Sequence, residues 1–324
     1  MCTAITLKTK DFYFGRTLDN DYSYREEVTV TPRNFLFKFR KYDDIYTHFA
    51  MIGMAFNPDG YPLYYDAVNE KGLCMAGLNF VGNARFSEET ANKINLAQFE
   101  LIPYVLGVCA NVSEAIKCLK NINLINSAYS DGMPSAQLHW IIADAKCAVT
   151  VEFVEDGLKI YDNNAGVLTN NPPFDLQMFN LNNYLSLTAK EPVAAFSDKI
   201  ELKTYSRGMG ALGLPGDLSS QSRFVRAAFI KLNSVCENTE NESVNQFFHI
   251  LGAVEQPRGA CVLKNGKYEI TVYSSCCNAD KGIYYFTTYD NHRINAVNMN
   301  NLNLNGSEVY RFPINVTESI HYLN

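Results

Sequence analysis

Long apolar runs and basic clusters are both missing from this sequence. No uninterrupted apolar run approaches the roughly 20 residues of a membrane-spanning helix, and Lys8, Lys10 and Asp11 interrupt the start of the chain. We therefore expect no membrane partner and no secretory signal peptide. The chain has 28 Lys and Arg against 34 Asp and Glu, a formal net charge of -6. Because nucleic-acid-binding proteins usually present a basic surface, nucleic acid is not predicted as a partner either.

Cysteine pairs at metal-binding or redox spacing are also absent. The nine cysteines are odd in number and irregular in spacing, and no Cys-x-x-Cys occurs. This pattern predicts free thiols in a reducing cytoplasm, and neither a metal site nor a cofactor. Cys276 and Cys277 are adjacent in a strand-like run, so their side chains should point to opposite faces. His139, beside Trp140 in an apolar strand, is predicted to be a satisfied core residue, because no histidine lies in a local protease signature around cysteine.

A glycine-rich stretch, Gly208-Met209-Gly210-Ala211-Leu212-Gly213, matches the G-x-G-x-x-G pattern of dinucleotide-binding proteins. That pattern requires a helix that begins inside the glycines. Pro215 and Gly216 lie where the helix should run, and no acidic residue ends a strand about 20 residues later. We therefore interpret the stretch as a flexible loop near a ligand.

The order of the predicted elements indicates sheets covered by helices. Period-two alternation and short apolar runs over most of residues 2–80 predict consecutive strands, among them the alternation of Phe35, Phe37 and Phe39. Helical spacing occurs at 95–109, from Ser113 onward, at 219–236 and at 243–254, with strands between these pairs and near the end of the chain. With 47% hydrophobic residues, we expect one α+β domain over residues 1–324, built of antiparallel sheets with helices outside.

Cys2 follows the initiator methionine directly, and small residues at this position permit removal of Met1. Trimming would leave one residue that carries both a thiol and a free α-amine. A free thiol, with a pKa near ~8.5, is mostly protonated at neutral pH, whereas an α-amine with a pKa of roughly 7.7 to 8.0 is partly neutral and can act as a base. This combination is typical of N-terminal nucleophiles. The alternative is a small buried cysteine at a strand start, and position 2 alone does not decide between them.

Further polar residues lie where predicted strands pair or end. Arg16 and Asp19 lie in the strand expected to pair with that of Cys2, where Arg16 would favour the thiolate and Asp19 would accept a hydrogen bond from the α-amine. A surface ion pair of little energetic value is the alternative. Asn79, Asn170 and Asn171 lie where strands end, which suits either turn formation or an amide donor for an oxyanion.

The sequence resembles the choloylglycine hydrolase family, whose bile salt hydrolases and penicillin V acylases are N-terminal-nucleophile hydrolases. The matching stretches span nearly the whole chain in order: Met1-Cys2-Thr3, Phe14-Gly15-Arg16-x-x-Asp19, Asn69-Glu70-Lys71-Gly72-Leu73, Met75-Ala76-Gly77-Leu78-Asn79-Phe80, Leu168-Thr169-Asn170-Asn171-Pro172, Gly213-Leu214-Pro215-Gly216-Asp217, Ser222-Arg223-Phe224 and Phe247-Phe248-His249-Ile250-Leu251. The resemblance implies an αββα sandwich of two antiparallel sheets with helices outside. It also implies a homotetramer, in the cytoplasm of a gut bacterium.

The same resemblance implies a reaction and a set of residues. Cys2 would be the nucleophile that cleaves the amide bond between a bile acid and glycine or taurine, with reverse transfer to an amine as a second outcome. The residues that match the family's active-site positions are Cys2, Arg16, Asp19, Asn79, Asn170 and Arg223. Asn79 is typical of bile salt hydrolases, where penicillin V acylases carry Tyr.

The substrate pocket and the competing functions are less constrained by the sequence. The candidates for an apolar steroid pocket are Leu18, Tyr24, Phe56 and Tyr65, together with the 126–136 loop. One alternative is an acylase for penicillin V or N-acyl-homoserine lactones. The other, from a different class, is a bile-acid-binding or thiol-sensing protein without turnover.

Overall fold

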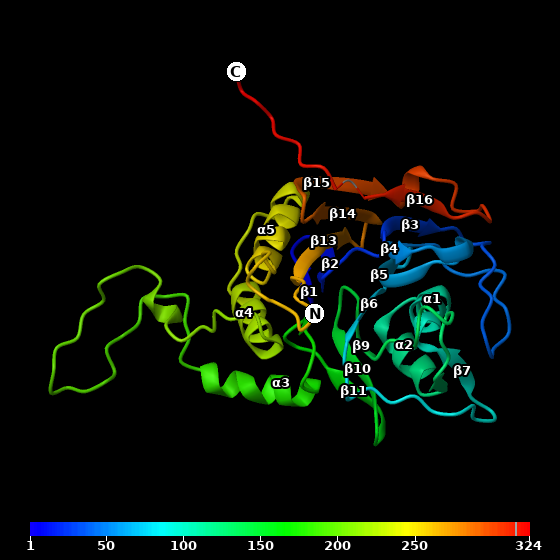
Figure 1. Cartoon of the computed structure of the whole chain (residues 1–324). Helices are drawn as coiled ribbons and strands as arrows, with labels where there is room; N and C mark the ends of the chain where they lie inside the picture. The colour runs from blue at the N-terminus through cyan, green and yellow to red at the C-terminus, as the bar shows by residue number, and fades with distance from the viewer. Residues whose placement is uncertain (315) are drawn as a thin grey trace.

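Two antiparallel β-sheets lie face to face between layers of helices (Figure 1). The computed structural model describes residues 1–314 and 316–324. The predicted αββα sandwich is confirmed, and the element order of strands, two helices, strands, helices and strands agrees with the sequence.

The first sheet contains the start of the chain, beside the edge strand β12. Among the described residues it has six strands, in which β1 and β2 form a hairpin and Cys2 pairs with Leu18. Long-range pairing then places the distant strand β13 beside β2. In spatial order the strands are β12 (Val167–Leu168), β1 (Cys2–Lys8), β2 (Phe12–Asn20), β13 (Ile270–Asn278), β14 (Ile283–Thr288) and β15 (Asn291–Asn298).

The second sheet has eight strands among the described residues, all paired antiparallel. In spatial order they are β11 (Gly157–Asp162), β10 (Ala148–Val154), β9 (Leu138–Ala143), β6 (Cys74–Asn79), β5 (Leu63–Asn69), β4 (Met51–Phe56), β3 (Glu27–Thr31) and β16 (Tyr310–Pro313). A short parallel pair, β7 (Ile94–Ala97) with β8 (Ile122–Ile125), lies beside this sheet.

Helices cover the outer faces of both sheets (Figure 1). α1 (Leu101–Val108) and α2 (Val112–Leu119) lie against the eight-stranded sheet. α3 (Phe174–Asn180), α4 (Ser220–Leu232) and α5 (Glu240–Gly252) lie on the side of the six-stranded sheet. The starts of α2, α4 and α5 are capped by side chains, each of which accepts a bond from the main chain three residues later, as in Ser219 and Thr239.

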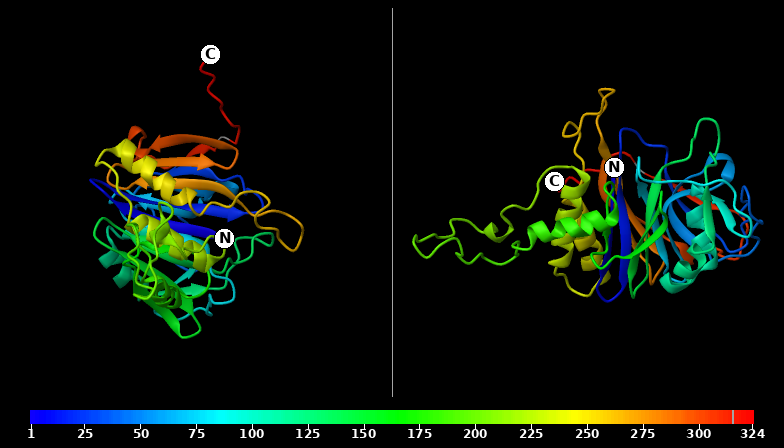
Figure 2. Two further views of the ribbon diagram at one scale, coloured as in Figure 1. Left: turned by 90° about the vertical axis from the view of Figure 1, so that its left-hand side faces the viewer. Right: turned by 90° about the horizontal axis from the view of Figure 1, so that it is seen from below.

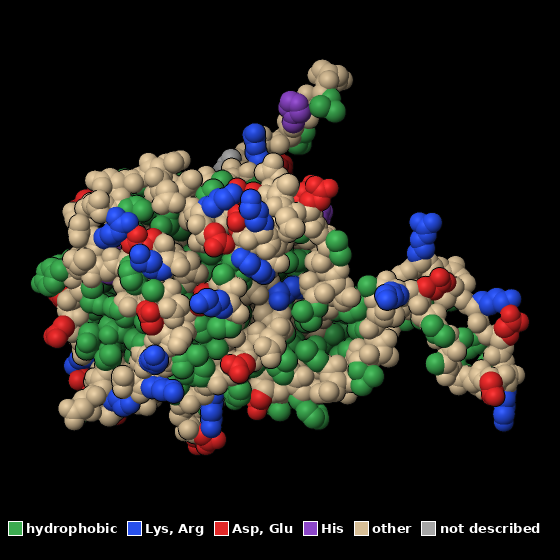
Figure 3. Space-filling model, turned by 180° about the vertical axis from the view of Figure 1, so that it is seen from behind, with side chains coloured by type: hydrophobic (Ala, Val, Ile, Leu, Met, Phe, Trp, Pro, Cys, Tyr) green, Lys and Arg blue, Asp and Glu red, His purple; other side chains and the backbone are tan. Residues whose placement is uncertain are grey.

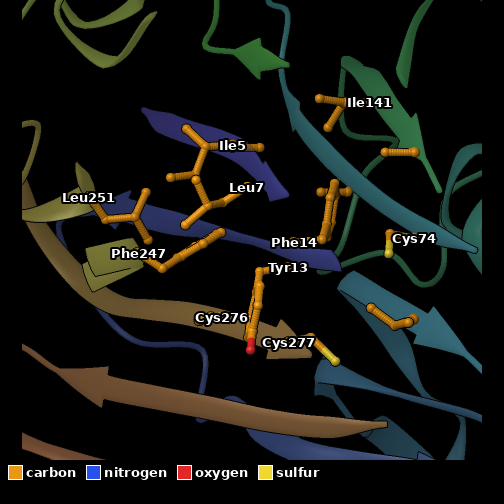
Figure 4. Close-up of a cluster of buried hydrophobic side chains, with 14 of the residues drawn as sticks. Ile5, Leu7, Tyr13, Phe14, Cys74, Ile141, Phe247, Leu251, Cys276 and Cys277 are labelled. Atoms are coloured by element: carbon orange, nitrogen blue, oxygen red, sulfur yellow. The ribbon is translucent and has the colours of Figure 1, made fainter. Parts of the chain in front are cut away.

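The alternation of side chains in the central strands fills two apolar layers (Figure 4). Phe14 and Cys277 lie between the sheets with Cys74. Ile5 and Phe247 lie between the first sheet and α5. Cys276, next to Cys277, points to the helix side, so the predicted opposite orientation of the two cysteines is confirmed.

Gly15 explains how β2 and β13 approach so closely. A Cβ atom built on Gly15 would lie 2.0 Å from the carbonyl oxygen of Ser275 in β13. No side chain fits at that distance, so the strand that carries Arg16 and Asp19 requires glycine here.

Two predicted elements were wrong. Phe35, Phe37 and Phe39 alternate in sequence but form no strand, only an isolated bridge between Phe37 and Ile45. Their rings instead form contacts with other aromatic rings over the second sheet, such as Phe39 with Tyr104. The helix predicted over 95–109 begins only at Leu101, because residues 94–97 pair as a strand with 122–125.

A long segment stands away from the sandwich between α3 and α4. In Figure 2 and Figure 3 residues 185–208 project as an extended loop that carries both charged and apolar side chains. The glycine-rich stretch lies at its return, around a single 3-10 turn at Met209–Ala211, and no helix begins there, which agrees with the loop interpretation. Among the described residues, no helix combines the length and apolar character needed to cross a membrane.

Candidate active site

A cavity of about 470 Å³ lies between the two sheets and reaches Cys2. Four predicted site residues line it: Cys2, Arg16, Asp19 and Asn79. The four predicted substrate-binding residues line it as well: Leu18, Tyr24, Phe56 and Tyr65. Asn170 and Arg223 do not belong to the lining and lie behind Cys2 instead.

Aromatic rings form much of the cavity wall. On one side Tyr24 lies between Tyr22 and Tyr65, with ring centroids 4.6 Å and 6.4 Å away. On the other side Phe99 and Tyr129 meet edge to face at 5.3 Å. Tyr129 belongs to the predicted 126–136 loop, of which residues 132–136 also line the cavity. Such a wall suits an apolar, rigid ligand.

Cys2 is the first residue of β1, and its side chain is 3% exposed. Its main-chain nitrogen donates to Oδ1 of Asn170 at 2.9 Å, and its carbonyl oxygen accepts from Nη1 of Arg223 at 2.6 Å. Cys2 is thus held by main-chain bonds on both sides, while its thiol meets the cavity.

Arg16 crosses from the first sheet to the second beneath Cys2. Its side chain is 1% exposed, and Nη1 donates to the carbonyl oxygens of Gly77 at 2.5 Å and Tyr65 at 3.2 Å. Burial disfavours its charge, but electrostatic interaction with the acidic groups around it, those of Cys2, Tyr273, Asp66 and Asp19, raises the pKa of the guanidinium. Arg16 therefore remains a cation beside the thiol.

Asp19 lies on the helix-facing side of β2. Its carboxylate accepts bonds from the hydroxyls of Thr271 at 2.7 Å and Thr17 at 3.2 Å, and lies 3.8 Å from Arg223. Burial raises the pKa of this carboxyl group, against the opposing effect of Arg223. The sequence reasoning expected this carboxylate to accept from the α-amine. In the full chain, Asn170 accepts from the Cys2 nitrogen.

Asn170 follows β12 and connects Cys2 to the second sheet. Its Oδ1 accepts from the Cys2 nitrogen and, at 2.8 Å, from Nη2 of Arg223. Its Nδ2 donates to the main-chain oxygen of Asn79 at 2.9 Å. Asn79 ends β6, and its residue is exposed where it lines the cavity. The strand-end position predicted for both asparagines thus brings them together.

Arg223 on α4 is fully buried and holds the start of β1 from behind. Besides Cys2 and Asn170, it donates to Oγ1 of Thr3 at 2.6 Å and to the carbonyl oxygen of Leu218. Burial lowers the pKa of its guanidinium. Arg223 does not line the cavity, and each of its three guanidinium nitrogens donates to an oxygen of the protein.

Several contributors were not found by sequence reasoning. Thr271 holds Asp19, and the Ser220 hydroxyl accepts from the Asn170 nitrogen at 2.8 Å. Glu269 forms an ion pair with the ammonium group of Met1, which also donates to the main-chain oxygen of Asp19. All three contacts join distant parts of the chain, so no local pattern indicates them. The one available sequence signal was the pair Ser219 and Ser220 at the start of the predicted helix.

His139 has the core role predicted for it. Its ring nitrogens bond to Glu152 and to the carbonyl oxygen of Thr169, both at 3.0 Å, and its ring stacks on Phe80. Through Thr169 it steadies the residue before Asn170.

Within residues 1–314 and 316–324, no group of three or more His, Cys, Asp or Glu side chains is arranged to hold a metal ion.

The fold and the placement of Cys2 define an N-terminal-nucleophile hydrolase fold. A family model described as linear amide C–N hydrolases, choloylglycine hydrolase family, matches residues 2–312. The chain therefore belongs to the choloylglycine hydrolase family, and the resemblance inferred from its motifs is confirmed.

Named relatives agree over the whole length. The chain is 52% identical over 324 residues, covering 100% of both chains, to a bile salt hydrolase/transferase of Lactiplantibacillus plantarum. It is 38% identical to a bile salt hydrolase/transferase of Clostridium perfringens, again over 100% of both chains.

Solved structures show the same fold. The conjugated bile acid hydrolase of Clostridium perfringens superimposes with a TM-score of 0.92 at 37% identity, covering 100% of both chains. A penicillin V acylase of Agrobacterium tumefaciens shares the fold, with a TM-score of 0.74 at 21% identity over 96% of this chain and 90% of the other.

Proposed function

We propose that this protein hydrolyses the amide bond that joins a bile acid to glycine or taurine, with Cys2 as the nucleophile. The observation that carries the proposal is the position of Cys2 in the lining of an aromatic-walled cavity between the sheets, in a chain of the choloylglycine hydrolase family. The relatives named above, called bile salt hydrolases, support this choice of substrate.

The first chemical step is attack of the Cys2 thiolate on the amide carbonyl carbon. The buried guanidinium of Arg16 interacts electrostatically with Cys2 and supplies positive charge beside the attacking sulfur. Attack forms the S–C bond and moves the carbonyl electron pair onto oxygen. The Asn79 side chain at the cavity and an amide hydrogen of Asn170 are our candidates to bind that oxyanion, with main-chain N–H groups.

The leaving group needs a proton, and the α-amine of Cys2 is our candidate to supply it. This requires removal of Met1, after which the nitrogen that donates to Asn170 is a free amine. The amine takes the thiol proton as base and gives it to the departing glycine or taurine nitrogen. Asp19, Thr271 and Arg223 keep this corner of the site in place.

Water then attacks the thioester, releases the bile acid and restores the thiol. If an amine attacks in place of water, the same thioester yields a new amide, which is the reverse transfer. The Lactiplantibacillus relative is named as a bile salt hydrolase/transferase, which supports this second outcome.

The cavity wall supports a steroid as the acyl part. Leu18, Tyr24, Phe56 and Tyr65 are proposed to bind it, together with the loop that contains Tyr129. Their apolar surfaces remove a rigid hydrocarbon skeleton from water, which is favourable by about 25 cal/mol per Å² of apolar surface.

Kinetics on a panel of amides tests the proposal. Release of glycine and taurine from conjugated bile acids is measured beside hydrolysis of penicillin V and an N-acyl-homoserine lactone, with intact mass of the same preparation. We expect fast amine release from bile acid conjugates and a mass lower by one methionine. Faster hydrolysis of penicillin V or of the lactone would favour the acylase alternative, and bile acid binding without amine release would favour the non-catalytic one.

We further infer the setting in which this enzyme works. One domain over residues 1–324 is supported by two apolar clusters that share the eight-stranded sheet. All nine cysteines are free thiols, which supports a reducing cytoplasm, and the relatives support a gut bacterium as the source. A homotetramer is supported by the projecting 185–208 segment. Its exposed apolar side chains would be removed from water by contact with a neighbouring subunit.

A further inference from the structure

A second cavity, of about 500 Å³, lies between α5 and one end of the six-stranded sheet. Its lining differs from that of the cavity at Cys2, and Thr271 of β13 connects the two regions, because it lines this cavity and its hydroxyl donates to Asp19. Its lining is rich in hydroxyl, amide and imidazole groups, the residues used below being His249, Glu255, Gln256, Thr271, Ser274 and His292.

The floor of this cavity contains a polar side chain without a partner. Gln256 is 0% exposed, and among the described residues neither its amide nitrogen nor its amide oxygen has a hydrogen-bond partner. Its main chain, in contrast, is paired in both directions with Thr271, at 2.8 Å and 3.1 Å. Leaving a buried amide unpaired costs roughly 1–3 kcal/mol. A polar group that enters the cavity and forms a hydrogen bond with Gln256 would recover this free energy.

The charge at the mouth favours a cation. Among the described residues that line the cavity, Glu255 is the one carboxylate, and lysine and arginine are absent. One oxygen of Glu255 accepts from the Ser274 hydroxyl at 3.2 Å, and its residue is exposed to solvent. His292 already has a charged partner, because its Nδ1 lies 2.5 Å from a carboxylate oxygen of Glu318 in the C-terminal segment. When His292 is protonated, the two charges of this pair cancel. His249 and Tyr289 line the cavity as well.

We propose that this cavity is a second binding site, for a small primary ammonium compound that carries one further hydrogen-bonding group. The ammonium group binds the Glu255 carboxylate at the mouth, and the second polar group binds the amide of Gln256 on the floor. This site is separate from the cavity that holds Cys2 and does not depend on the proposed reaction.

Ethanolamine is a suitable probe, and ethylene glycol is its uncharged control. The protein is the full chain with Cys2→Ala, in which no acyl transfer can consume the amine. Melting temperature is measured at about pH 7.5 with each compound, and crystals are soaked in ethanolamine. At several times its dissociation constant, ethanolamine should raise the melting temperature by about 1–2 °C, and ethylene glycol should not. Electron density for the probe should appear between Glu255 and Gln256.

Two variants in the same background locate the effect. Glu255→Gln, at an exposed position, should fold normally and lose the ethanolamine shift. Gln256→Leu should melt at the same or a higher temperature, because it removes unpaired polar atoms, and should reduce the shift. The proposal is overturned by an equal shift with ethylene glycol, by a shift that persists in Glu255→Gln, or by ordered water alone beside Gln256 in the soaked crystals.

Discussion

Cys2 owes its position to contacts on its main chain, not on its side chain. Asn170 accepts from its nitrogen and Arg223 donates to its carbonyl oxygen, and these two residues bond to each other. The thiol is therefore left for chemistry while the residue itself is fixed, which is what an N-terminal nucleophile requires. Substitution of the thiol alone should consequently spare the fold.

We expect Cys2→Ser to fold with a melting temperature close to that of the wild type and to lose activity by roughly 10³-fold or more. A hydroxyl is far less acidic than a thiol, so the mild α-amine cannot activate it to the same degree. Amine release from a conjugated bile acid and the melting temperature are measured on one preparation. Cys147→Ser, at an exposed cysteine, is the matched control, and a Cys2→Ser enzyme as active as that control would assign the chemistry elsewhere.

Asn170→Ala separates catalysis from turn formation. Loss of one oxyanion donor typically lowers kcat by about 10²–10³-fold with little change in KM. The side chain also forms hydrogen bonds with Cys2, Arg223 and Asn79. Its removal should therefore lower the free energy of unfolding by roughly 1–3 kcal/mol, and with it the melting temperature. The decisive comparison is kcat per folded molecule.

Asn171→Ala is the control for that experiment, because Asn171 is next in sequence and its side chain donates at the surface to the carbonyl oxygen of Val81. It should keep kcat. A stable Asn170→Ala enzyme with near wild-type kcat would remove Asn170 from catalysis and leave Asn79 and main-chain N–H groups as oxyanion donors.

At the scale of elements, the sequence was informative where one face of a strand packs on the core. β1, β2, β5 and β6 were predicted from their apolar patterns. The pattern of Phe35, Phe37 and Phe39 was equally regular, but their rings pack against other aromatic rings while their main chain forms no ladder. Periodicity reports which side chains are buried, not which main chain finds a partner.

The same limit applies to the candidate site. Cys2, Arg16 and Asp19 were predictable because they lie in one hairpin. Asn79 and Asn170 were recognised as strand ends, yet their mutual bond depends on the packing of the two sheets. The contacts made by Thr271 and Glu269 span about 250 residues of sequence, and nothing local indicates them.

Glu100 gives the turn before α1 a predicted pH dependence. It ends a 3-10 turn, Gln98–Glu100, and its fully buried carboxylate accepts from the main-chain nitrogens of Arg40 at 2.7 Å and Ala97 at 2.8 Å. Arg40 in turn donates to the carbonyl oxygen of Tyr129 in the cavity wall. Burial raises the pKa of Glu100 from 4.5 to about 7.

Between these two pH values the folded chain keeps a proton that the unfolded chain releases, so this group's contribution is full below pH 4.5 and is lost as pH rises to about 7. The loss amounts to roughly 3 kcal/mol at most. We expect Glu100→Gln to remove this part of the pH dependence, measured by urea unfolding at about pH 5 and about pH 7.5. Glu201→Gln, at an exposed position, should leave the slope as in the wild type, and an unchanged slope in Glu100→Gln would contradict the assignment.

At the scale of the whole molecule, residues 185–208 expose apolar side chains that a monomer leaves in contact with water. Within this segment Leu185, Val193, Phe196 and Tyr205 are each more than 80% exposed, and the segment leaves the sandwich entirely (Figure 2). Such a segment has few internal contacts to hold it, so a neighbouring copy that covers these side chains would supply the missing burial.

The last prediction follows from this geometry. Val193→Glu places a charge on the extended segment, and Val235→Glu makes the same change at an equally exposed valine between α4 and α5, with exposed fractions of 89% and 88%. If the segment is an interface, Val193→Glu buries an unpaired charge there and weakens assembly, whereas Val235→Glu leaves it intact. Light scattering coupled to size-exclusion chromatography gives the molar mass of each. We expect a tetramer for the wild type and for Val235→Glu, and a smaller species for Val193→Glu whose isolated subunits keep the sandwich, since the segment contributes nothing to either sheet. An unchanged tetramer in Val193→Glu would place the interface on another face of the molecule.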